Sequence, residues 1–328
     1  MLQHLTAAPT IERVLTECAG ARIGERALIV TDFDADQAVV DAFAAALGAR
    51  GLDISIISCR RAPVPGASPP DSVARAMLGA DLILELTSSF IGSAPCRLEA
   101  CANGARYLTM PGMSWHTLRP GGPFWVDFLA AREEAEALGR SIDAANTYRL
   151  VTDAGTDLQG SFAGRKGRAL HGVASTPGSY MAPPDIEVGA APVEGTSNGV
   201  ILIDGPMLFL CDEPPRRPVR VRVEEGCAAG IEGPDSHFLL DAIARCGDSR
   251  MNVIAEVSVG MNPCARPTGG PLELEGAMGC AHFALGNNAA YGGNNPAVSH
   301  LDSILFGASL ILDGKVAIDH GRLEAGAS

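Results

Sequence analysis

Continuous apolar runs alternate with helical patterns through the first 110 residues, and this alternation constrains the fold more than any other feature of the sequence. Runs that are apolar throughout, rather than at every second residue, are typical of strands buried on both faces of a parallel sheet. The chain is therefore expected to begin with an α/β domain built on a mainly parallel sheet. The expected strands are residues 26–33, 53–59, 81–87 and 106–111, and the expected helices are residues 36–49, 70–78 and 96–103.

The first expected strand is not followed by the glycine-rich motif that binds dinucleotides, because Thr31-Asp32-Phe33-Asp34 stands there. A Rossmann-like sheet without a standard dinucleotide site is expected. Such sheets bind ligands at the carboxyl ends of their strands. His116 lies in the loop after the fourth strand, so it is a candidate catalytic residue, with an ordinary surface histidine as the alternative.

The second half of the chain has a different pattern. A Gly/Pro break at residues 120–123 precedes an expected long helix at residues 125–145, so we place a domain boundary near residue 146 and expect domains at residues 1–146 and 147–328. Short apolar runs separated by Gly, Pro and Asn predict a mainly antiparallel α+β domain. The candidate ligands described below make it the expected metal-binding domain. Its expected elements are strands at residues 148–152, 157–162, 200–204, 207–210 and 219–223, a helix at residues 236–245, and a hairpin at residues 310–318 that turns at Asp313-Gly314.

Composition excludes several classes of protein. A net charge of −13 disfavours nucleic acid and anionic membrane surfaces as partners. The first ten residues show no signal-peptide pattern, and no apolar run approaches the roughly 20 residues that cross a bilayer. The nine cysteines form no C-x-x-C pair, which favours reduced thiols in a cytoplasmic protein. Cys280, two residues before His282, is either a soft metal ligand or a small buried residue.

Five residues in the second half are candidate metal ligands. His300 and Asp302 are two residues apart in an extended segment, so their side chains share one face and both offer a lone pair to one ion. His282 and Glu256 lie within apolar segments, and Glu187 follows a proline turn. Each residue has an ordinary alternative, such as a core histidine, a helix or turn cap, or a solvated glutamate. Together, three carboxylates and two imidazoles exceed what one tetrahedral ion needs and suit two divalent ions that share a carboxylate.

Four stretches around these residues resemble the aminopeptidase T family of dinuclear metallopeptidases, within the broader group that includes 2,5-dihydroxypyridine dioxygenases. They are residues 186–200, 255–263, 281–286 and 300–302, and residues 155–158 with Gly164-Arg165 resemble a further family segment. The resemblance implies metal ligation by Glu187, Glu256, His282, His300 and Asp302. It also implies divalent Zn, Mn or Co, a small-molecule or short peptide substrate, and a homodimer.

One position departs from the peptidase pattern. The peptidases have a catalytic Tyr seven residues after the histidine of the third stretch, and that position here is Ala289. Tyr291, in a Gly/Asn-rich loop, is the candidate substitute, and the alternative is a tyrosine packed on the surface. Because the peptidase tyrosine is missing at this position, more than one function remains open.

The first possible function is a metal-dependent hydrolase of an amide or peptide bond, in which Glu256 or Asp302 bridges two ions and Glu187 also acts as a general base. The second is an Fe(II) ring-cleaving dioxygenase of a dihydroxylated N-heterocycle such as 2,5-dihydroxypyridine, with iron held by His282, His300 and Asp302. The dioxygenase relatives resemble this chain with His at the position of Glu256 and without the counterpart of His282. A third possibility is a non-catalytic metal-binding or scaffold protein.

Overall fold

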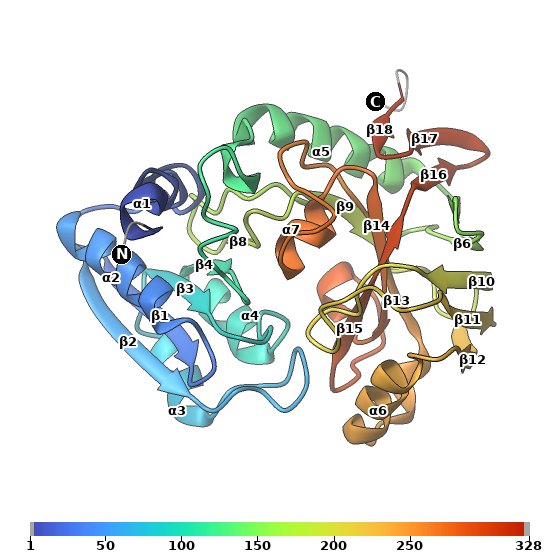
Figure 1. The fold of residues 1–328 in the computed structure, drawn as a ribbon, viewed down its shortest axis with the longest axis horizontal. Helices are drawn as coiled ribbons and strands as arrows, with labels where there is room; N and C mark the ends of the chain where they lie inside the picture. Colours follow the sequence, from blue (N-terminus) through green and yellow to red (C-terminus); the bar gives the residue numbers. More distant parts are fainter. Residues whose placement is uncertain (1–2, 325–328) are drawn as a thin grey trace. The chain divides into compact units, whose positions relative to one another are not determined.

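The structure is a computed structural model that describes residues 3–324. Its elements form two compact units, each assembled from several segments of the chain (Figure 1). The boundary near residue 146 stays a prediction, and the outer ends of the two predicted domains lie outside the described residues. The first unit comprises Met1–Leu129, His171–Asp185 and Pro263–Glu273, and the second comprises Ala130–Leu170, Ile186–Asn262 and Leu274–Ser328.

The first unit contains a parallel five-stranded sheet in the order β2-β1-β3-β4-β8, which confirms the predicted parallel sheet. Its strands are β1 (Arg26–Asp32), β2 (Asp53–Cys59), β3 (Leu82–Leu86), β4 (Arg106–Thr109) and β8 (Tyr180–Met181). Its helical elements are α1 (Gln3–Arg13), the π-helix η1 (Val14–Cys18), α2 (Gln37–Ala49), α3 (Asp71–Met77), α4 (Pro95–Ala102) and the 3₁₀ turn η2 (Pro123–Trp125).

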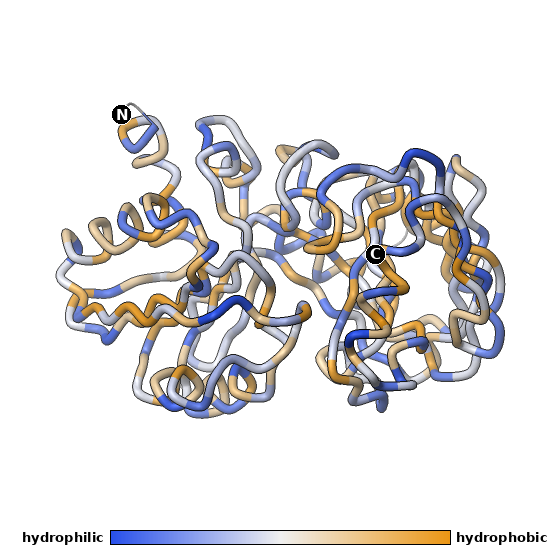
Figure 2. Tube along the Cα trace, turned by 60° about the horizontal axis from the view of Figure 1, so that its bottom comes forward, coloured by the Kyte–Doolittle hydropathy of each residue, from blue (hydrophilic) through white to orange (hydrophobic). Residues whose placement is uncertain are grey.

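The core of this unit follows from its continuous apolar strands. Leu28 and Val30 of β1 pack with Ile83 of β3 against Val73 and Met77 of α3. Figure 2 shows the strands in hydrophobic colour with helices on both sides, as expected for strands buried on both faces. The predicted helices and strands of residues 26–111 all form, within a few residues at their ends.

The second unit contains two antiparallel sheets, as the sequence predicts. Sheet B has the order β12-β11-β10-β6-β5-β16-β17-β18, and sheet C has the order β15-β14-β13-β9-β7. The strands of sheet B are β5 (Thr147–Thr152), β6 (Asp157–Ser161), β10 (Asn198–Ile203), β11 (Val219–Glu224), β12 (Cys227–Glu232), β16 (Ala308–Leu312), β17 (Lys315–Asp319) and β18 (Arg322–Leu323). Those of sheet C are β7 (Arg168–Leu170), β9 (Glu187–Ala190), β13 (Ile254–Gly260), β14 (Cys280–Gly286) and β15 (His300–Phe306).

Helices are few in and beside this unit. They are α5 (Phe128–Ala144), α6 (His237–Cys246), the short α7 (Pro271–Gly276), and the 3₁₀ turns η3 (Ser249–Asn252) and η4 (Ala289–Tyr291). The predicted hairpin forms, with Asp313 and Gly314 both at positive φ (47° and 79°), the conformation that a two-residue hairpin turn requires. The carboxylate of Asp313 also accepts the backbone N–H groups of Asn146 and Thr147.

One strand prediction is wrong. Residues 207–210 form a turn, in which the N–H groups of Leu210 and Cys211 both donate to the carbonyl of Met207. Phe209 has a φ of 61°, which is incompatible with a strand. Within residues 207–210, strand-like pairing is confined to Met207, which forms isolated bridges to Ser303 and Cys211. Among the described residues, no helix is long and apolar enough to span a membrane.

Candidate metal centre

The predicted ligands lie on one face of sheet C. Residues directly opposite each other on neighbouring strands share a face, and the register places Glu256, Ala284 and Asp302 in one row. A second row pairs His300 with Gly286, and a third pairs Glu187 with Gly260. The four strands β9, β13, β14 and β15 therefore deliver all five predicted ligands to the same side of the sheet.

Small residues fill the positions between these ligands on the same face. Gly189, Ser258, Gly260, Ala284 and Gly286 alternate with the acidic and imidazole side chains along their strands. A Cβ on Gly189 would collide with the side chain of Ser258, and one on Gly260 would collide with the backbone of Glu275 and Ala277. The sheet face thus has room for large donor side chains only because their neighbours are small.

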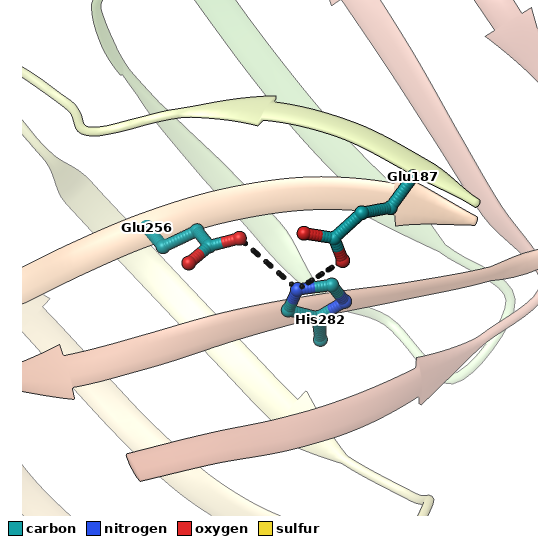
Figure 3. A group of neighbouring side chains, drawn as sticks. All are labelled: Glu187, Glu256 and His282. Atoms are coloured by element: carbon teal, nitrogen blue, oxygen red, sulfur yellow. Dashed lines mark hydrogen bonds and ion pairs between the residues drawn. The ribbon is translucent and has the colours of Figure 1, made fainter. Parts of the chain in front are cut away.

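The first group of donors comprises Glu187, Glu256 and His282, whose ligand atoms lie within 4.8 Å of one another. The Nε2 atom of His282 is 3.0 Å from Oε2 of Glu187 and 3.1 Å from Oε1 of Glu256. Figure 3 shows both carboxylates pointing at this one nitrogen from neighbouring strands. The hydroxyl of Ser258 donates to Oε1 of Glu256 and helps to fix the carboxylate.

The second group comprises Glu256, His300 and Asp302. The Nε2 atom of His300 is 3.0 Å from Oε2 of Glu256 and 3.2 Å from Oδ1 of Asp302. On the other side of the ring, Nδ1 lies 2.6 Å from the carbonyl oxygen of Asn287. A hydrogen bond from Nδ1 to a carbonyl fixes the tautomer and directs the Nε2 lone pair of a neutral ring at the cluster, as in histidines that bind metal.

A sixth donor, Glu275, completes a third group with His282 and Asp302. It lies at the end of α7 and is buried. Glu275 is not among the ligands predicted from the sequence, because a Glu in a short Leu-Glu-Leu-Glu-Gly segment matches no metal motif. Its position seven residues before His282, in a segment between two other ligands, was the available signal.

The described residues fit a metal ion on two structural grounds. Oε2 of Glu187 and Oδ1 of Asp302 are buried without a hydrogen-bond partner, although each lies close to an imidazole nitrogen. Buried carboxylate oxygens without a hydrogen-bond partner, this close to imidazole nitrogens, suit a cation that both kinds of atom can coordinate. In addition, the four carboxylates of Glu187, Glu256, Glu275 and Asp302 would carry four negative charges when all are ionised, and two divalent cations would balance these charges.

The electrostatics of the cluster favour positive charge. Burial alone would raise the pKa of Glu256, which is 0% exposed, but its close contacts with the imidazoles of His282 and His300 lower it below its usual value. Burial opposes protonation of His282, yet the charge of Glu187 raises the pKa of that imidazole well above its usual value. Burial and the charge of Asp302 raise the pKa of Glu275. The cluster therefore stabilises cations and resists further negative charge.

Tyr291 reaches this cluster from the loop between β14 and β15. Its hydroxyl donates to Oε1 of Glu187 at 2.9 Å, and its ring lies parallel to that of His300 with centroids 5.9 Å apart. The side chain is buried, so the alternative of a tyrosine packed on the surface is wrong. The structure thus brings the candidate substitute for the missing family tyrosine to the predicted ligands.

Two other candidates lie apart from these groups. His116 is exposed, in a turn after β4 of the first unit, and its catalytic role stays a prediction. Cys280 belongs to none of the three donor groups found among the described residues, and burial raises the pKa of its thiol to about 12. All nine cysteines are free, in agreement with the expectation of reduced thiols.

Comparison with known proteins places this geometry in context. The sequence model of the family described as 2,5-dihydroxypyridine 5,6-dioxygenase matches residues 6–325, and no curated protein matches the sequence. The fold is similar to that of 2,5-dihydroxypyridine dioxygenase from Pseudomonas putida KT2440, with a TM-score of 0.76 and 18% identity over 98% of both chains. It is also similar to wild-type AmpT, an aminopeptidase T, from Thermus thermophilus, with a TM-score of 0.71 and 16% identity over 98% of this chain and 99% of that one. The predicted resemblance to this broader group is confirmed.

Proposed function

The chain belongs to the 2,5-dihydroxypyridine 5,6-dioxygenase family, and from the donor set of sheet C we propose that it is a metal-dependent hydrolase of an amide or peptide bond. The proposed substrate is a small molecule or a short peptide. The proposed cofactor is a pair of divalent ions, which are Zn, Mn or Co. The negative charge of the chain disfavours nucleic acid and anionic membrane surfaces as alternative partners.

A single observation carries this proposal: Glu256 directs one carboxylate oxygen to each of two donor groups. Oε1 is near His282 and Oε2 is near His300. A carboxylate with this arrangement is suited to bridging two ions. Among the described residues, none of the groups of three donors within 4.8 Å contains both histidines, which an iron site of two histidines and one carboxylate would need.

The side chains have distinct roles in the proposed reaction. Two divalent ions at this site would polarise the scissile carbonyl and lower the pKa of a water molecule. Glu187 accepts the proton of the attacking water, because its carboxylate lies at the edge of the cluster beside Tyr291. The Tyr291 hydroxyl is a neutral donor beside Glu187, and it stabilises the oxygen on which negative charge develops.

Metal content and turnover test the proposal together. The protein is purified without oxygen, its metals are measured per chain, and it is assayed with aminoacyl anilides and dipeptides. We expect close to two divalent ions per chain and amide hydrolysis that a chelator abolishes and added metal restores. Metal content near two with no turnover of any amide would leave non-catalytic metal binding as the better description.

Family membership favours a second candidate, the Fe(II) ring-cleaving dioxygenase. It would use fewer of the donors described here, because one iron bound by His282, His300 and Asp302 leaves Glu187, Glu256 and Glu275 without a role as ligands. The same preparation separates the two functions. One iron per chain, with oxygen uptake that depends on a dihydroxylated N-heterocycle, would replace the hydrolase by the dioxygenase.

A further inference from the structure

The loop that carries Tyr291 has little regular structure of its own. Residues 287–299 connect β14 to β15, and η4 supplies a single 3₁₀ turn, Ala289–Tyr291. The loop is rich in Gly and Asn, and Gly292, directly after the tyrosine, has a φ of 77°. A segment of this composition has many accessible conformations, so side chains outside it must select the one in which Tyr291 faces Glu187.

We infer that Arg165 and Glu194 are positioning residues that clamp this loop and thereby aim the Tyr291 hydroxyl at the metal centre. Neither residue belongs to the donor groups. The inference rests on the proposed function, because Tyr291 is assigned a role in hydrolysis there.

Arg165 fixes the loop next to the tyrosine. Its guanidinium Nη1 donates to the carbonyl oxygen of Gly292 at 2.6 Å, and its Nη2 forms an ion pair with Glu194. The Arg165 side chain is only 9% exposed and that of Glu194 is 32% exposed, so the arginine end of the pair is shielded from solvent while the carboxylate end is partly exposed. A planar guanidinium that makes both contacts at once defines the position of the Gly292 backbone relative to Glu194.

Glu194 fixes the loop on both sides of the tyrosine. Its Oε1 atom accepts hydrogen bonds from the side-chain amide of Asn288 at 2.8 Å and from the backbone N–H of Asn294 at 2.7 Å. The amide oxygen of Asn288 in turn accepts the backbone N–H of Asn295 at 2.7 Å. One carboxylate therefore holds a residue before Tyr291 and a residue after it.

Gly293 makes this arrangement possible. A Cβ at this position would overlap the side-chain amide of Asn288. The Asn288 amide can reach Glu194 and Asn295 only while position 293 has no side chain. A Gly293→Ala substitution therefore disturbs the same clamp from within the loop, without removing either charged partner.

The tyrosine ring is held between two further groups. The Arg168 guanidinium carbon lies 4.5 Å from the ring centroid, and the His300 ring stacks at 5.9 Å. Arg168 is opposite Gly189 in the register, so it shares the sheet face on which Glu187 lies. These ring contacts and the clamped backbone together hold the hydroxyl in its hydrogen bond to Oε1 of Glu187.

The test compares Glu194→Gln and Gly293→Ala with a matched control, Arg149→Met, which breaks an exposed ion pair with Asp157 on sheet B. Three quantities are measured on the metal-loaded protein: hydrogen exchange of the peptide covering residues 287–295, metal content, and kcat and KM on an amide substrate. Each variant is also made in the Tyr291→Phe background.

We expect both clamp variants to exchange faster in residues 287–295 while metal content stays at the wild-type level. We expect kcat to fall about 10- to 100-fold, as for a misplacement of roughly 1 Å at a reacting centre, with KM changed less than kcat. In the Tyr291→Phe background the same substitutions should lower kcat no further. The Arg149→Met control should change none of these quantities.

Two results would overturn the inference. One is unchanged hydrogen exchange in residues 287–295 of both clamp variants. The other is a kcat loss that is as large with Phe at position 291 as with Tyr, because the clamp would then act through another group. If the wild-type protein hydrolyses no amide, the proposed function fails, and hydrogen exchange alone decides whether the clamp exists.

Discussion

At the scale of single residues, Glu256 is a carboxylate with no exposed surface. A fully buried carboxylate is stable only when its charge is compensated, and here two imidazoles and the Ser258 hydroxyl surround it. In the proposed enzyme, cations take over much of this compensation. Removing the carboxylate charge should therefore disturb both donor groups at once.

We predict that Glu256→Gln loses metal from both positions. The affinity loss should exceed the roughly 10- to 100-fold that follows removal of a hydrogen-bond partner of a metal ligand. Metal content after extensive dialysis is the measurement. The control is Glu85→Gln, which alters a buried carboxylate of the first unit that accepts hydrogen bonds from Tyr107 and Thr109. Retention of two ions by Glu256→Gln would rule out the bridging role.

The sequence predicts the strand ligands and misses the others for a physical reason. In a strand, period two places His300 and Asp302 on one face whatever the rest of the fold does. Glu275 lies at the end of a six-residue helix, and Tyr291 lies in a loop. Their positions depend on long-range packing that no local pattern encodes. Glu275 was therefore not predicted, and the sequence left two alternatives for Tyr291, a place at the site or packing on the surface.

At the scale of elements, the small residues of sheet C are as informative as its ligands. Gly286, opposite His300, has a φ of 106°, and a Cβ there would overlap the carbonyl oxygen of Ser299. Patterns such as H-x-A-x-G are therefore packing requirements of the centre as well as sequence signatures. The strand prediction at residues 207–210 is wrong because all four residues are apolar, as in a buried strand, although their backbone forms a turn.

We predict that Gly286→Ala destabilises the fold more than Gly314→Ala. Both positions have positive φ and carry a strain of roughly 1–2 kcal/mol for a non-glycine residue. At Gly314 nothing lies within 4 Å of the added Cβ, whereas at Gly286 the clash adds to the strain. Urea denaturation of the two variants measures the difference in free energy of unfolding. Equal losses would mean that the sheet relaxes around the new methyl group.

The clamp on the Tyr291 loop has a defined pH dependence. Burial opposes ionisation of Glu194, but hydrogen bonds from Asn294 and Asn288 and the charge of Arg165 lower its pKa below the usual 4.5. Because the pKa of Glu194 is lowered in the folded state, its ionised carboxylate stabilises the clamp above about pH 4.5. This stabilisation is lost as the pH falls through the lowered pKa. Hydrogen exchange of residues 287–295, corrected for its intrinsic rate, should stay constant from neutral pH to about 4.5. Loosening already near pH 6 would contradict this assignment.

At the scale of the whole molecule, metal binding and folding should be linked. Ions that bind the folded chain alone stabilise it, by about 2.7 kcal/mol at a free concentration 100 times the dissociation constant. We predict that chelation lowers the melting temperature of the wild-type protein and that added Zn or Mn restores it. In Asp302→Ala the melting temperature should respond much less to either treatment. A homodimer stays a prediction, which light scattering of the purified chain would test.

The parallel sheet could be predicted almost completely, because continuous apolar runs separated by helices specify both its class and its strands. The register of sheet C could not, since it joins strands from distant parts of the chain. In particular, Glu187 on β9 precedes the consecutive strands β13, β14 and β15 by a long segment that contains the strands β10, β11 and β12 of sheet B.

This separation in the chain affects the order in which the two groups of donors form during folding. The donor Glu256 lies on β13 and the donors His300 and Asp302 lie on β15, at the two sides of the consecutive antiparallel strands β13, β14 and β15, which can pair soon after they are synthesised. The donors Glu187, Glu256 and His282 meet only after β9 has closed a much longer loop. A refolding chain should therefore capture its first ion near His300, and its second only when the rest of sheet C is in place.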